Sequence, residues 1–80
     1  MSYYVYILRC ADGSLYTGST TDIQRREAVH NQGCGAKYTR GRLPVQMIYS
    51  EEHPDRAAAQ RREAEIKKLK RAAKIALASE

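Results

Sequence analysis

Two tyrosines near the start of the chain, Tyr6 and Tyr16, are the first candidates for chemistry. Between them lies Asp12-Gly13, a dipeptide typical of tight hairpin turns, so we expect Tyr16 on the strand next to Tyr6. Cross-strand tyrosine pairs often serve packing alone. Phe would pack as well, however, and the chain has 6 Tyr with no Phe or Trp, which indicates that some hydroxyls matter.

Arg26 and His30 form a second candidate pair, four residues apart in a segment predicted to be helical. They share a helix face with Ile23, the only large aliphatic residue before Val29. Because that face should lie against the rest of the protein, both polar side chains are predicted to point inward. The alternative is that the helix packs through its aliphatic residues and Arg26 is simply solvated.

Glu63 is the third candidate. By the period of 3.6 residues it lies within about 60° of Ile66, on the apolar stripe of the second predicted helix, whereas Glu65 lies further round. A carboxylate on a core-facing stripe is costly unless it is paired or binds a metal. Glu63 is therefore either a metal ligand or part of an ion pair, with Lys67 at i+4 or with a basic residue elsewhere in the chain.

The elements that would position these residues follow from periodicity, turn residues and helix caps. Three strands are predicted, over Ser2–Cys10 (buried on both faces), Ser14–Gly18 and Pro44–Ser50. A type I′ turn at Asp12-Gly13 should join the first two. Helices are predicted over Thr21–Asn31, from an N-cap at Asp55 to about Lys70, and, after a kink, over Arg71–Ala78, with a basic loop over Gly33–Arg42. This β-β-α-β-α order predicts an α+β fold with a small three-stranded antiparallel sheet flanked by helices.

Composition limits the class of protein. Eighty residues predict a single domain over 1–80, and the net charge of +5 favours a polyanionic partner such as nucleic acid. Cys10 and Cys34 lack a zinc-ligand pattern and are expected to be reduced thiols. With no basic segment ahead of the first apolar run and no long apolar stretch, we expect a cytoplasmic protein without membrane contact.

The ordered set of motifs resembles the GIY-YIG nuclease superfamily, most closely its small stand-alone bacterial members. The matching segments are Tyr4-Val5-Tyr6, Tyr16-Thr17-Gly18, Thr21–Arg26 with His30 after it, Ala36–Arg40, Pro44-Val45 and Arg62-Glu63 followed by Ile66–Leu69. Three positions depart from the pattern. Tyr4 replaces a glycine, Thr17 replaces an isoleucine, and Glu27 adds a negative charge beside Arg26 that would weaken phosphate binding.

The resemblance implies a metal-dependent DNA endonuclease, in DNA repair or processing, that leaves 5′-phosphate and 3′-hydroxyl ends. Glu63 would bind a single Mg²⁺ or Mn²⁺ ion, and Arg26 would hold the scissile phosphate. Tyr6 would orient or deprotonate the attacking water, assisted by Tyr16 and His30. Which of these groups is the general base is left open.

The basic loop is the predicted contact with nucleic acid, through Lys37, Tyr38, Arg40 and Arg42. Its alternative is a solvated loop. DNA is the expected partner, whether single-stranded, duplex or branched, with no small-molecule cofactor and with a monomer as the default. A non-catalytic nucleic-acid-binding module of the same fold is the main alternative, and a basic adaptor for another protein is a remote one.

Overall fold

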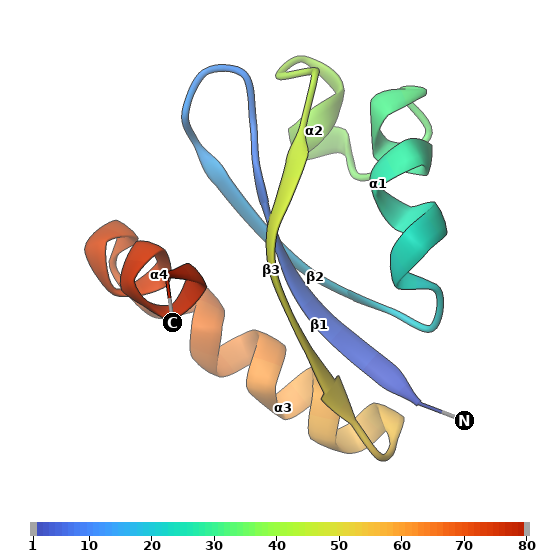
Figure 1. Ribbon diagram of the computed structural model, residues 1–80, viewed down its shortest axis with the longest axis vertical. Helices are drawn as coiled ribbons and strands as arrows, with labels where there is room; N and C mark the ends of the chain where they lie inside the picture. Colours follow the sequence, from blue (N-terminus) through green and yellow to red (C-terminus); the bar gives the residue numbers. More distant parts are fainter. Residues whose placement is uncertain (1, 80) are drawn as a thin grey trace.

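The computed structural model describes residues 2–79 and has the predicted α+β architecture. Strands β1 (Tyr3–Arg9), β2 (Leu15–Thr20) and β3 (Gln46–His53) form one antiparallel sheet in the order β2-β1-β3. Helices α1 (Ile23–Asn31) and α2 (Lys37–Arg40) cover one face, while α3 (Arg56–Lys67) and α4 (Arg71–Ala78) lie on the other (Figure 1).

Strand β1 is the centre of the molecule, as its continuous apolar run predicts. Val5, Tyr6, Ile7 and Leu8 are all buried, and alternate side chains enter two separate cores. Val5 and Ile7 pack with Ala59 and Ile66 of α3, whereas Tyr6 and Leu8 pack with residues on the α1 side. The face that carries Tyr6 is therefore the one that α1 and α2 cover.

The hairpin between β1 and β2 differs from the expected type I′ turn. Of its two central residues only Gly13 has a positive φ, of 86°, and the amide of Gly13 donates to the carbonyl of Cys10. The turn closes with the amide of Cys10 donating to the carbonyl of Ser14, which makes a three-residue loop with a left-handed glycine. β2 then extends to Thr20, two residues beyond the predicted end.

Both long helices begin at aspartate caps. Asp22 accepts from the amide of Arg25 at 3.1 Å, so α1 starts at Ile23 rather than Thr21. Asp55 accepts from the amide of Ala58 at 2.8 Å, which confirms its predicted role as N-cap of α3. The chain leaves helical geometry at Lys70, so the expected kink is a full break between α3 and α4.

Two other predictions were wrong. The segment expected to be a loop contains the short helix α2, which four residues are too few to reveal by periodicity. β3 runs from Gln46 to His53 instead of ending at Ser50, because Glu51 and Glu52 continue the pairing with β1 despite their charge. Glu51 is accommodated there by Arg62 of α3, whose Nε lies 3.0 Å from its carboxylate.

Candidate functional site

Tyr6 is the centre of a buried group of polar side chains. It is 1% exposed, and its hydroxyl Oη lies 3.1 Å from Nε2 of His30. The Nε–H of Arg26 donates to the same oxygen at 3.3 Å. Both partners come from the inward face of α1, so the predicted orientation of that face is confirmed and the solvated alternative for Arg26 is wrong.

His30 is held from its other side by a residue that the sequence did not single out. The ring is 1% exposed, and its Nδ1 lies 2.8 Å from Oγ1 of Thr39, a fully buried residue of α2. Thr39 Oγ1 also donates to the carbonyl of Ala36 at 2.9 Å. A threonine inside a basic segment gives no sequence signal for such a contact, because the contact depends on the unexpected helix α2.

Tyr16 extends the group toward the surface. Its ring centre lies 6.4 Å from that of Tyr6, as the hairpin predicted, and 5.5 Å from that of His30. Gly18, which pairs with Tyr6 across the sheet, provides the space: a Cβ there would lie 2.5 Å from Tyr6 Oη. Gly35 packs directly on the His30 ring in the same manner. Glycine is needed at both positions because side chains approach its backbone closely.

Glu63 lies on α3 and is half-buried, in keeping with the inward helical phase that the sequence predicted. Its side chain is 21% exposed, while Glu65 is exposed on the outer surface of the helix. The carboxylate lies 2.7 Å from Nζ of Lys67, so the ion-pair reading of this residue is present. The pKa of Tyr6 is raised chiefly by burial, and the negative charge of Glu63 adds a smaller effect in the same direction.

The electrostatics of the site keep both central groups neutral. Burial raises the pKa of Tyr6 above its ordinary value of 10.0, although the hydrogen bond and the charge of Arg26 oppose this rise. Burial, together with the charge of Arg26, lowers the pKa of His30 below its ordinary value of 6.5. At neutral pH the pair is therefore a protonated phenol beside an uncharged imidazole.

Comparison with known proteins decides the family. The sequence model of a protein family, the GIY-YIG catalytic domain, matches residues 2–76. The chain belongs to the GIY-YIG family. This places it in a nuclease superfamily, whose substrates are in general nucleic acids.

Similar proteins of this GIY-YIG family are small. A UPF0213 protein of Streptococcus sanguinis is 57% identical, over 96% of this chain and 88% of its own length. A UPF0213 protein of Natronomonas pharaonis is 53% identical, over 98% and 92% respectively. The solution NMR structure of a UPF0213 protein from Bacillus halodurans superposes with a TM-score of 0.62, at 51% identity, over 99% of this chain and 84% of that one. These names state no activity.

A metal ion in this GIY-YIG domain would depend on Glu63. Within residues 2–79, no three His, Cys, Asp or Glu side chains gather into a group able to hold a metal. Mg²⁺, however, keeps several waters and binds through one or two carboxylates plus substrate phosphates. A single half-buried glutamate fits that mode, provided that it releases Lys67.

None of the helices within residues 2–79 has the length and apolar character needed to cross a bilayer.

The predicted nucleic-acid contacts lie on or beside α2, and the structure divides them into two kinds. Lys37 and Arg40 are exposed. Arg42 is engaged within the protein: its Nε lies 3.1 Å from Asp12, and its guanidinium lies 4.1 Å from the centre of the Tyr38 ring. Tyr38 is 41% exposed, with one face under Arg42, and its ring also stacks against Tyr16. Arg42 thus holds Tyr38 in place instead of projecting freely.

The sequence suggested that Glu27 would place its negative charge beside Arg26. In the structure its carboxylate is instead bonded elsewhere. Its carboxylate accepts from the amide of Met47 at 2.7 Å, at the edge of β3. The departure from the family pattern therefore joins α1 to the sheet through a hydrogen bond to a backbone donor.

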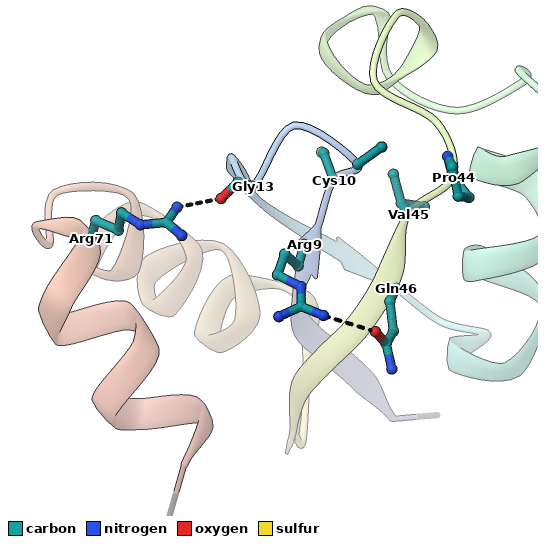
Figure 2. Close-up of a pocket in the computed structure, with 8 residues that line it drawn as sticks. Arg9, Cys10, Gly13, Pro44, Val45, Gln46 and Arg71 are labelled. Atoms are coloured by element: carbon teal, nitrogen blue, oxygen red, sulfur yellow. Dashed lines mark hydrogen bonds between the residues drawn. The ribbon is translucent and has the colours of Figure 1, made fainter.

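An open pocket of about 560 Å³ lies at the hairpin end of the sheet, beside the turn that contains Gly13 (Figure 2). Arg9 and Arg71 line it, but both are bonded to neutral oxygens, Arg9 to the side chain of Gln46 and Arg71 to the carbonyl of Gly13. None of the predicted catalytic residues lines this pocket.

Proposed function

We propose that the chain is a divalent-metal-dependent endonuclease that hydrolyses phosphodiester bonds of DNA and leaves 5′-phosphate and 3′-hydroxyl ends. The observation that supports this most is the buried Tyr6 hydroxyl, bonded to both an imidazole and a guanidinium. Burying the Tyr6 hydroxyl and the His30 ring, with Arg26 half-buried beside them, is costly unless each polar group is hydrogen-bonded, and packing alone does not require them.

Arg26 is the residue proposed to hold the phosphate. It lines an open pocket of about 300 Å³ together with Ser19, Thr20, Arg56 and Gln60. Every polar side chain lining this pocket can donate a hydrogen bond, and none is acidic. Such a donor set favours an anion, and the planar guanidinium suits two phosphate oxygens at once.

Tyr6 is the proposed group that orients and deprotonates the attacking water. Because it is 1% exposed, substrate must open a path to its hydroxyl. Arg26 makes the longer of the two hydrogen bonds there, at 3.3 Å, and a phosphate can draw this half-buried side chain away. Water oxygen then attacks phosphorus and the bond to the 3′ oxygen breaks. The phenol oxygen takes the water proton as it gives up its own to the hydrogen-bonded imidazole of His30, and the 3′ oxygen takes a proton from solvent to become the 3′ hydroxyl.

Glu63 would hold the metal ion, which supplies charge stabilisation for the leaving 3′ oxygen. Lys37 and Arg40 would contact neighbouring phosphates, and the exposed part of Tyr38 offers an aromatic surface to a base.

The test is cleavage of single-stranded, duplex and branched DNA by the purified protein, with Mg²⁺, Mn²⁺ or EDTA. We expect metal-dependent cleavage that falls by about 100-fold or more in Arg26→Ala and in Glu63→Gln. Glu65→Gln, two residues away and exposed, is the matched control and should cleave as the wild type does. Equal trace cleavage by wild type and Glu63→Gln would mark a contaminant, and salt-sensitive binding without cleavage would instead identify a nucleic-acid-binding module.

A further inference from the structure

The hydrogen bonds behind Tyr6 have one possible direction, and Ala36 fixes it. A backbone carbonyl only accepts, so the single hydroxyl hydrogen of Thr39 must point to Ala36, 2.9 Å away. Thr39 Oγ1 can then only accept from His30 Nδ1, at 2.8 Å. The Nδ1 atom of His30 therefore carries a hydrogen.

The direction continues to the surface. Because neutral imidazole has one N–H, Nε2 of His30 is left as an acceptor and takes the hydroxyl hydrogen of Tyr6, at 3.1 Å. Tyr6 Oη in turn accepts from Arg26 Nε, which has no lone pair to offer. Each of the four hydrogen bonds is consistent with the one before it, with no donor facing a donor.

We propose that Thr39 is a positioning residue that holds His30 in its Nδ1–H tautomer, so that Nε2 receives the proton of Tyr6 during the reaction. The O–H bond of Tyr6 breaks and an Nε2–H bond forms, giving a tyrosinate beside an imidazolium. Thr39 Oγ1 accepts from Nδ1 before and after this step, so the relay needs no rotation behind the ring.

The charge pair made by this transfer has support on both sides. Arg26 stays beside the tyrosinate oxygen or on the phosphate next to it, and the imidazolium keeps both of its N–H groups hydrogen-bonded. Gly35, packed against the His30 ring, prevents the ring from leaving Thr39. The phenol can thus act as a base although its ordinary pKa of 10.0 is far above neutrality.

The tautomer can be read without any nuclease assay, by two-bond ¹⁵N–¹H correlation NMR of the histidine rings in the uniformly labelled protein. The chain has two histidines, and His53→Gln assigns the signals of His30. In wild type at neutral pH we expect the Nδ1–H pattern. The Nε2–H pattern there would overturn the proposal, whatever the protein cleaves.

Variants at Thr39 separate tautomer control from packing. Thr39→Val keeps the shape and removes the acceptor, so His30 should shift to the Nε2–H tautomer, which donates to Tyr6 instead of accepting. Thr39→Ser keeps the hydroxyl and should retain the wild-type NMR pattern. An unchanged tautomer in a folded Thr39→Val protein would refute the role of Thr39, and if that variant fails to fold, the wild-type and Thr39→Ser spectra still decide.

The catalytic part of the proposal rests on the endonuclease function above, and the same variants test it. Cleavage should fall by about 100-fold or more in Thr39→Val with DNA affinity unchanged, and Thr39→Ser should recover most of it. Full cleavage by Thr39→Val together with an altered tautomer would show that the relay is not used. No cleavage by wild type with the expected tautomer would contradict the endonuclease function but leave the tautomer assignment intact.

Discussion

Substituting Gly18 with alanine tests the packing on which the whole site depends. The added Cβ would lie 2.5 Å from Oη and 2.7 Å from Cζ of Tyr6, where ordinary contacts begin at 3.4 Å. The phenol must therefore move by roughly 1 Å, which is enough to break its 3.1 Å hydrogen bond to His30. β2 has little freedom to yield instead, because Gly18 is paired in register with Tyr6 on the central strand.

The expected loss of stability combines three contributions. Overpacking costs about 1–3 kcal/mol and the lost hydrogen bond about 1 kcal/mol, while replacing a strand glycine returns about 0.5–1 kcal/mol. The free energy of unfolding should thus fall by about 1–3 kcal/mol, or about 5–20 °C in Tm for a domain of this size. A displacement of 1 Å in a catalytic group should also slow cleavage by about 100-fold.

Gly41→Ala is the matched control for this experiment. Gly41 ends α2 with a φ of −91°, which alanine adopts freely, and a Cβ there meets nothing within 4 Å. Its Tm should stay the same or rise slightly. Thermal unfolding followed by circular dichroism compares the two variants. If Gly18→Ala unfolds at the wild-type temperature and cleaves DNA at the wild-type rate, the close packing of Tyr6 on Gly18 is wrong.

Three further predictions concern stability. Thr17→Val should raise the free energy of unfolding by about 1–2 kcal/mol, because the buried Thr17 hydroxyl has no hydrogen-bond partner within residues 2–79; a lower denaturant midpoint would contradict this. Glu51→Gln should lower the free energy of unfolding by about 1–3 kcal/mol, because Glu51 loses its charged hydrogen bonds to α3 and β3. The control Glu52→Gln, at an exposed neighbouring position, should change this free energy little. Because the folded state lowers the pKa of His30, its contribution to stability should be present above about pH 6.5 and lost as the pH falls below it, so urea midpoints should depend less on pH in His30→Gln.

Local patterns in the sequence predicted the elements best where one cause dominates. The apolar run of β1 requires burial on both faces whatever surrounds it, and Asp55 before an alanine-rich segment caps a helix by a local hydrogen bond. Strand ends were predicted poorly, because Glu51 is tolerated in β3 only through Arg62, a partner eleven residues away. Such compensation is tertiary, and no window of local sequence contains it.

The positions of the candidate site residues could be predicted from the sequence to a similar extent. Hairpin register and helical phase placed Tyr6, Tyr16 and Arg26 on surfaces that the fold brings together, and helical phase turned Glu63 partly inward on α3. No local feature of the sequence selects Thr39, since nothing there distinguishes a threonine that orients a histidine from one that faces water. The role of Thr39 becomes visible only from the three-dimensional structure, in which its hydroxyl hydrogen is already donated to the carbonyl of Ala36.

The excess of tyrosine over other aromatic residues has a partial explanation in the hydrogen bonds. The hydroxyl of Tyr6 belongs to the series of hydrogen bonds that ends at the carbonyl of Ala36. The hydroxyl of Tyr49 donates to Glu51 at 2.5 Å. The two networks differ in kind. The second is centred on a carboxylate, which only accepts and so draws its donors together without passing a proton along. The first alternates donors and acceptors from the half-buried Arg26 inward, and its fixed inner end leaves a proton only one direction in which to move, from Tyr6 to His30.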